Sequence, residues 1–190
     1  LLLLGIVCVF FDGATAYMVN RLDTVNSILN GIAHGCFLLS IDAFIYLLFL
    51  YMLAITSGLP KKRKTQLLMI LPFKVNVIIV IIFTPMLEYR HGTITNYSMG
   101  MAAYTCYIMA VVYIVAIMVV FFRRWKYIES HKRTSILTYL CVLFGVTLCQ
   151  MIWPEVLLTS ICVTVIIVGM YLNQENPSLK ELSTYHHEMV

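Results

Sequence analysis

Long apolar stretches alternate with short polar ones along the whole chain. A helix needs about 20 mostly apolar residues to cross a bilayer, and six stretches approach this length. They cover about residues 1–20, 32–56, 67–85, 98–122, 136–153 and 155–172. The pattern predicts an all-α integral membrane protein, a bundle of six transmembrane helices forming one domain over residues 1–172.

The ends of the chain add two expectations. The first apolar stretch has no basic residues before it and is longer than the apolar part of a secretory signal peptide, so we interpret it as a true span. The sequence starts without Met and stops within a polar segment. We therefore expect it to be part of a longer protein.

Composition excludes a soluble protein. Apolar residues make up 61% of the 190 residues and charged residues 12%, with a mean hydropathy of +0.90. A soluble domain is about 45–50% apolar. Six spans with short connections use nearly the whole chain, which leaves no room for a soluble domain.

The positions of Lys and Arg predict the orientation. Short loops rich in Lys and Arg stay on the cytoplasmic side of a membrane. One predicted side carries two basic loops and the tail, with Lys61, Lys62, Arg63, Lys64, Arg123, Arg124, Lys126, Lys132, Arg133 and Lys180, whereas the other carries only Arg21 and Arg90. We expect both termini to be cytoplasmic, in the inner (cytoplasmic) membrane. Because the net charge of +4 resides in these loops, the lipid bilayer is the expected partner and nucleic acid is not.

The sequence contains no pattern typical of an enzyme or a cofactor site. The six cysteines all lie in apolar stretches and form no Cys-x-x-Cys pair, so we interpret them as small core residues and expect neither disulfides nor a metal site. A nucleophile with its base, a phosphate-binding glycine loop and a zinc motif are also missing. We expect this chain to have no enzymatic activity and to need no cofactor.

Three ionisable residues lie deep in the predicted spans. Each costs about 2.5–3.5 kcal/mol on insertion scales, so each requires a reason to be there. At 1.5 Å per residue, Asp12 lies roughly 12 Å and Asp42 roughly 15 Å from the outer boundary, and Lys74 roughly 12 Å from the inner one. In a core about 30 Å thick, Lys74 reaches the level of Asp42. The third span also contains Pro72, which predicts a kinked or unwound helix there.

These residues predict a polar centre that binds a ligand or moves with one. His34 lies two turns before Asp42 on the same side of its helix, and Gln150 lies at the outer end of the fifth span. The candidate site is therefore Asp12, His34, Asp42, Lys74 and Gln150. The alternative is structural: Lys74 extends to the nearer interface, and the other groups bond to backbone or hydroxyl partners.

The tail, residues 173–190, predicts a short signalling helix. Asn176-Pro177 is a cap followed by proline at the first helical position. Leu179, Leu182, His186 and Met189 follow at spacings of three, four and three, as in the seam of a coiled coil. This favours a homodimer joined through the C-terminal helix, and a solvated amphipathic tail is the alternative.

The last fifth of the chain resembles a known family. The residues concerned are Gln150-Met151-Ile152-Trp153-Pro154, Tyr171-Leu172, Glu175-Asn176-Pro177 and the final run Tyr185-His186-His187-Glu188-Met189-Val190. They are similar to the multi-span N-terminal sensor region of Gram-positive bacterial signalling proteins. The resemblance implies a cytoplasmic output domain after the tail: an HD-type cyclic-dinucleotide phosphodiesterase, a diguanylate cyclase or a histidine kinase. No catalytic motif of these domains lies within the chain.

The expected function is that of a membrane sensor in signal transduction, including cyclic-di-GMP signalling. It would detect a small or membrane-dissolved ligand and pass a conformational change to the output domain. The alternative is a small-solute transporter or channel that uses Asp12, Asp42 and Lys74 along its path. A transporter has no need of a coiled-coil seam after its last helix, so the tail favours the sensor.

Overall fold

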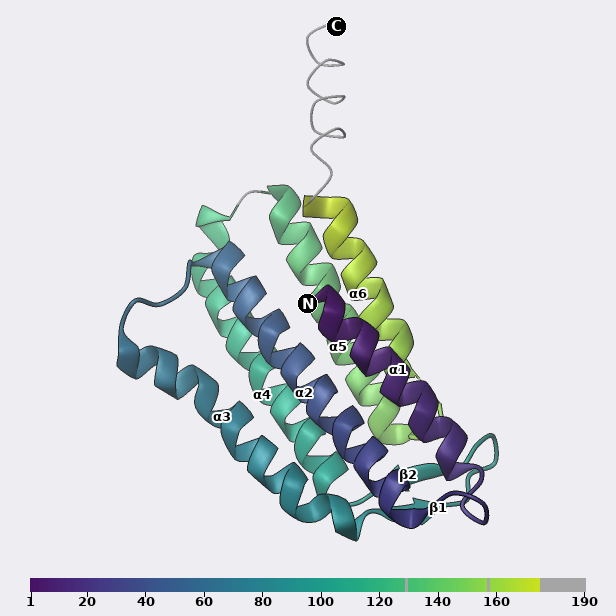
Figure 1. Ribbon diagram of the computed structural model, residues 1–190. Helices are drawn as coiled ribbons and strands as arrows, with labels where there is room; N and C mark the ends of the chain where they lie inside the picture. Colours follow the sequence, from purple (N-terminus) through teal and green to yellow (C-terminus); the bar gives the residue numbers. More distant parts are fainter. Residues whose placement is uncertain (129, 157, 175–190) are drawn as a thin grey trace, which may run out of the picture.

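In a computed structural model, described over residues 1–128, 130–156 and 158–174, the chain is almost entirely helical (Figure 1). The helices of this part are α1 (Leu2–Val19), α2 (Ser27–Thr56), α3 (Arg63–Phe83), α4 (Met101–Arg124), α5 (Ser130–Ile152) and α6 (Leu158–Gln174). The short elements are the strands β1 (Glu88–Arg90) and β2 (Tyr97–Met99) and the 3₁₀ turns η1 (Thr84–Met86) and η2 (Trp125–Tyr127). The predicted all-helical fold is confirmed, and the predicted tail helix lies outside the described residues.

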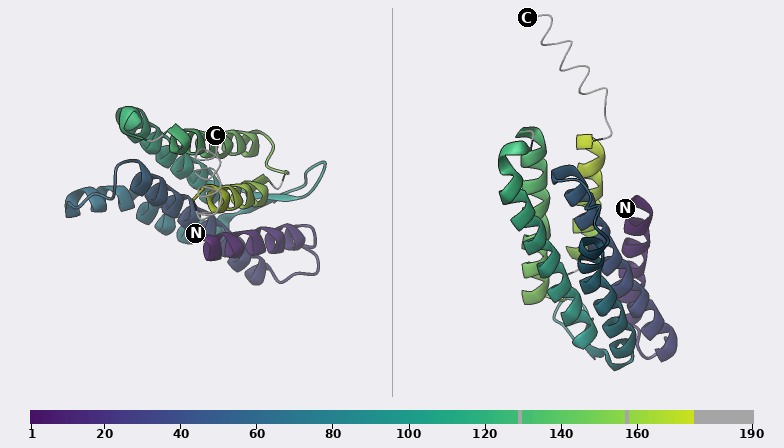
Figure 2. Two further views of the ribbon diagram at one scale, coloured as in Figure 1. Left: turned by 90° about the horizontal axis from the view of Figure 1, so that it is seen from above. Right: turned by 90° about the vertical axis from the view of Figure 1, so that its left-hand side faces the viewer.

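Five of these helices close into a ring. α1 packs against α2 and α6, α2 against α4, α4 against α5, and α5 against α6. α3 lies outside this ring, against α2 and α4. Its first turns stand at the rim of the bundle, away from the other helices (Figure 2).

The two ends of the bundle differ. At one end, here called the hairpin end, lie β1, β2, the α1–α2 connection and the start of α6 (Figure 1). The opposite end, here called the basic end, carries the α2–α3 and α4–α5 connections. Its cations include residues 61–64 and Arg123 and Arg124.

Four helical segments are long and apolar enough to cross a membrane: Leu2–Val19, Ser27–Thr56, Arg63–Met86 and Met101–Tyr127. α5 and α6 contribute shorter apolar stretches, Ile136–Ile152 and Leu158–Tyr171. The outer surface is apolar as well, since α3 exposes 68% of Leu68 and 60% of Ile81. Such a surface is compatible with a membrane protein.

α2 begins earlier than predicted, for a local reason. The second span was expected from about residue 32, but α2 begins at Ser27 because the Asn26 side chain accepts a hydrogen bond from the Ile28 backbone N–H (2.8 Å). A side chain that caps the first free N–H groups fixes where a helix begins. The first five residues of α2, 27–31, are therefore helical although they precede the predicted span.

α3 is continuous through Pro72, so the helix is not unwound there. Proline has no N–H, and its ring pushes apart the neighbouring backbone hydrogen bonds of the helix. A side chain of α4 fills the gap: the Phe73 N–H donates to the Tyr113 hydroxyl (3.1 Å), which donates to the Met69 carbonyl (2.9 Å). Phe73 and Met69 are an i, i−4 pair, so Tyr113 bridges two groups that would otherwise bond to each other.

The expected outer loop contains a β-hairpin. β1 and β2 pair antiparallel, with Glu88 opposite Met99 and Arg90 opposite Tyr97. Gly100 follows β2 with φ of +149°, a conformation that favours glycine, and turns the chain into α4. Strands of three residues are too short to give an alternating pattern that sequence reasoning could detect.

The apolar core fills the ring toward the basic end. Its fully buried side chains include Leu48 and Met52 of α2, Phe121 of α4, Ile136 of α5 and Ile166 of α6. Toward the hairpin end the polar side chains gather instead, and the ring is hollow there.

Candidate functional site

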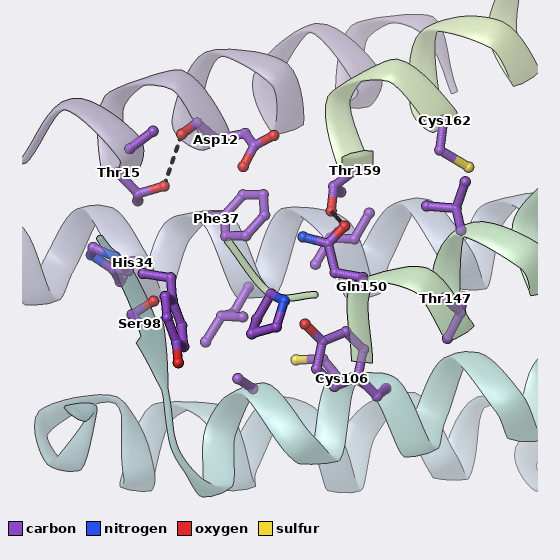
Figure 3. A pocket seen from close by; sticks show the side chains of 18 of the residues that line it. Asp12, Thr15, His34, Phe37, Ser98, Cys106, Thr147, Gln150, Thr159 and Cys162 are labelled. Atoms are coloured by element: carbon purple, nitrogen blue, oxygen red, sulfur yellow. Dashed lines mark hydrogen bonds between the residues drawn. The ribbon is translucent and has the colours of Figure 1, made fainter. Parts of the chain in front are cut away.

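A pocket of about 140 Å³ lies inside the ring at the hairpin end (Figure 3). All five ring helices line it, together with β2, the hairpin loop and the α5–α6 connection, and no residue of α3 does so. A cavity of about 150 Å³ in another protein accommodates benzene. The pocket therefore has room for a small ligand.

Asp12 provides the carboxylate of the pocket. It is 4% exposed, and one carboxylate oxygen accepts a hydrogen bond from the Ser160 hydroxyl of α6. On the same helix, the Thr15 hydroxyl donates to the Asp12 backbone carbonyl (2.9 Å; dashed in Figure 3). The bond to Ser160 connects the first helix of the bundle to the first turns of the last.

Gln150 and Thr159 form a second polar pair in the pocket. The Thr159 hydroxyl donates to Gln150 Oε1 (3.2 Å), and the two side chains come from α5 and α6 (Figure 3). Because Gln150 uses its carbonyl oxygen here, its amide nitrogen carries the remaining donors. Both polar pairs thus involve the start of α6.

His34 lines the pocket from α2. Its Nδ1 lies 2.9 Å from the Asn30 carbonyl, which can only accept, so Nδ1 carries the proton and Nε2 of the neutral ring is an acceptor. The His34 ring also meets Tyr89 of β1 edge to face, with 5.4 Å between centroids. This contact holds β1 of the hairpin against the N-terminal part of α2.

The hairpin loop contributes Thr95 and Asn96 to the lining of the pocket, and Asn20 and Glu155 hold this loop in place. Asn20 donates to the Thr95 hydroxyl (2.7 Å) and accepts from the Asn96 backbone N–H (3.1 Å). Glu155 accepts from the Ile94 N–H (2.9 Å) and the Thr93 hydroxyl (3.1 Å). The hairpin loop thus joins the end of α1 to the connection before α6.

Glu155 is partly exposed, and the hydrogen bond from the Ile94 backbone N–H affects its ionisation most. The bond from the Ile94 N–H, and then those from Thr93, lower the pKa of this carboxyl below its ordinary value of 4.5. Hydrogen bonds to the charged form favour ionisation. Glu155 is therefore a carboxylate at neutral pH.

Asp42 lies outside the pocket. Its side chain is fully buried, and one oxygen accepts a hydrogen bond from the Asn76 amide of α3. The second oxygen, Oδ1, has no hydrogen-bond partner in the described part of the chain. Asp42 thus belongs to a separate polar contact among α2, α3 and α4.

Lys74 does not join the other candidates. It is exposed on α3, and its position two residues before Asn76 turns it about 200° around the helix axis, away from Asp42. Within residues 1–128, 130–156 and 158–174 the one ion pair is Arg90 with Glu88 (2.7 Å), on the surface. The five residues predicted to form one polar centre are therefore not all brought together: Asp12, His34 and Gln150 line the pocket, whereas Asp42 and Lys74 do not.

Several polar residues of these contacts were not predicted as site residues from the sequence, among them Asn76, Asn96, Thr159 and Ser160. Hydroxyl side chains are common in membrane helices, so Thr159 and Ser160 gave no signal by themselves. Only the packing of α1 and α5 against α6 reveals their partners.

Comparisons of the chain with protein-family models, with curated proteins and with solved structures found no match. The resemblance to bacterial sensor regions therefore stays a prediction.

Proposed function

We propose that the chain is a six-span membrane sensor module of the bacterial inner membrane, with both termini cytoplasmic. It binds a small ligand in the pocket at the hairpin end and passes a conformational change through α6 to a cytoplasmic output domain. The resemblance of the tail to Gram-positive signalling proteins supports this proposal, as does the placement of the pocket within the ring.

The observation that carries the proposal is the contact of the pocket with the start of α6. Ser160 bonds to Asp12 and Thr159 bonds to Gln150, and α6 then runs through the bundle to the basic end (Figure 1). A ligand that favours one arrangement of these contacts shifts the population of α6 positions. A continuous helix carries that shift to its other end.

Charge supports the orientation. The basic end carries residues 61–64 and the Arg123-Arg124 pair, whereas the hairpin end carries Arg21 and Arg90. Lys and Arg stay cytoplasmic, so the hairpin end faces outward. The apolar stretch of α5, Ile136–Ile152, has about the shortest length that spans a bilayer, and that of α6, Leu158–Tyr171, is shorter.

Labelling of single cysteines tests this topology in a background without native cysteines. We expect Lys62→Cys and Lys126→Cys to react only with a reagent added on the cytoplasmic side, and Thr93→Cys only from outside. Reaction of Lys62→Cys and Lys126→Cys from opposite sides would refute the six-span arrangement.

The transporter alternative receives less support from the geometry. It needs Asp12, Asp42 and Lys74 along one path, but only Asp12 lines the pocket. Lys74 lies on the outside of α3, and a polar path through the ring does not include it.

The relay is tested by disulfide crosslinking in the full-length protein in membranes. The tail lies outside the described residues, so its seam stays a prediction: single cysteines at Leu179 and Leu182 should crosslink strongly and those at Lys180 and Ser183 weakly. Equal yields at all four positions would refute the paired helix.

A pocket variant then separates relay from mere dimerisation. Thr159→Val removes the hydroxyl that bonds Gln150 while keeping the shape of the side chain, and we expect it to change the ratio of crosslinks. The matched control is Thr105→Val, because the Thr105 hydroxyl donates to Ala102 within α4 (3.0 Å) and does not line the pocket. If Thr159→Val leaves the ratio as Thr105→Val does, the pocket is not coupled to the tail.

A further inference from the structure

The charge of the pocket is negative. Asp12 and Glu155 both line it, and none of the described residues lining the pocket is Lys or Arg. Glu155 is partly exposed, and Asp12 is buried in the ring. A cleft lined by one sign of charge attracts ligands of the opposite sign.

Among the described residues, none forms an ion pair with Asp12. The carboxylate is 4% exposed and has a hydrogen bond from one neutral hydroxyl, that of Ser160. The only ion pair found in the described residues, Arg90 with Glu88, lies elsewhere. Taking a carboxylate out of water is costly unless a cation and further hydrogen bonds accompany it, and an ionisable residue at membrane depth is a candidate for a functional site.

The other walls suit the body of an organic cation. Phe37, Phe44, Tyr97 and Tyr107 all line the pocket, and aromatic faces attract ammonium groups. His34 offers an acceptor at Nε2, which an ammonium N–H group can satisfy. At about 140 Å³, the space suits a group of the size of one ring.

We propose that the pocket binds a small organic cation, with one ammonium group held by Asp12 and an apolar body held against the aromatic wall. This inference rests on the proposed function, because it names the ligand class of the same pocket. Asp12 then binds the ligand on one side and Ser160 of α6 on the other, so occupancy acts directly on the last helix.

Three compounds of similar shape test the charge preference: benzylamine, benzyl alcohol and benzoate. The purified chain in lipid nanodiscs is titrated with each at neutral pH, and affinity is measured by calorimetry. We expect benzylamine to bind at least about tenfold more tightly than benzyl alcohol, and benzoate to bind more weakly than either. This comparison uses the unchanged protein, so it does not depend on the folding of a variant.

Two matched variants assign the preference to Asp12. Asp12→Asn keeps an acceptor for Ser160 and should abolish the preference, so that benzylamine binds about as tightly as benzyl alcohol. Asp42→Asn makes the same change at the other buried Asp, which does not line the pocket, and should leave the preference intact. A preference that survives Asp12→Asn would overturn the role of Asp12.

The remaining outcomes separate this inference from the proposed function. Equal binding of all three compounds, tighter binding of benzoate, or no binding of benzylamine at millimolar concentration would each overturn the cationic ligand. None of these results alters the crosslinking ratio of Thr159→Val, which tests the relay. An unchanged ratio together with a clear benzylamine preference would instead refute the sensor and leave a cation-binding pocket.

Discussion

The hydrogen bonds that Tyr113 makes to α3 next to Pro72 give a specific prediction about stability. Tyr113→Phe removes the hydroxyl that bridges the Phe73 N–H and the Met69 carbonyl but keeps the ring, which packs against Phe49 at 4.8 Å. The site is 3% exposed, so water does not replace the hydroxyl. A buried polar group left without its partner costs about 1–3 kcal/mol, and two such groups give an expected loss of about 2–6 kcal/mol.

A double-mutant cycle isolates the cause. Pro72→Ala restores an N–H for the Leu68 carbonyl and removes the ring that separates the next pair, so the helix can close its own hydrogen bonds. In that background Tyr113→Phe should cost less than about 1 kcal/mol, which leaves a coupling of at least about 1 kcal/mol between the two sites.

The assay is equilibrium unfolding in detergent micelles, followed by circular dichroism. At about 2–4 °C per kcal/mol for a chain of this length, the single change should lower Tm by at least about 4 °C. Tyr46→Phe is the control, because it also removes a hydroxyl while its ring stays stacked on Phe73 at 5.0 Å. If Tyr113→Phe lowers the free energy of unfolding equally with Pro72 and with Pro72→Ala, the bridging role of Tyr113 is refuted.

Two further predictions concern the polar contacts. Asn76→Ala removes the donor that reaches Asp42 from α3 and should lower the free energy of unfolding by about 1–3 kcal/mol. Lys74→Met should change this free energy little. A comparable loss for both variants would mean that Lys74 does pair with Asp42. Glu155 has a lowered pKa, so its contact with the hairpin loop is complete above the ordinary value of 4.5 and is lost as pH falls through the lowered pKa in the folded state. A spin label at Ile94, whose side chain is 76% exposed, should become mobile over that acid range. Glu155→Gln should abolish this change in mobility with pH. A change that persists in the variant would point to another titrating group.

Hydropathy predicted most of the helices because each apolar stretch has one stable solution in a membrane, a helix. It placed the boundaries less well where polar residues decide them. α2 starts at Ser27 because Asn26 caps it, and α6 starts at Leu158 rather than at residue 155 because Glu155 bonds to the hairpin loop instead.

The candidate site was harder to predict because helix faces, not depth, decide which side chains meet. Lys74 and Asn76 are two residues apart on α3, so they face different sides of the helix. Lys74 therefore points outward, whereas Asn76 reaches Asp42. Asp12 was recognised from its cost in the membrane, but its partner Ser160 was not, since it depends on α1 packing beside α6. Packing between the first and last helices leaves no trace in a single sequence.

The bond between Asp12 and Ser160 also has a consequence for biogenesis. The two residues are 148 positions apart in the chain, and ribosomes add about 5–20 residues per second. The first helix therefore waits roughly 7–30 s in the translocon or the membrane, with a costly carboxylate, before its partner is even synthesised. During this interval the half-made bundle is open along the side that α6 will close, and insertase or protease recognition of the exposed Asp12 would distinguish chains that never complete the ring.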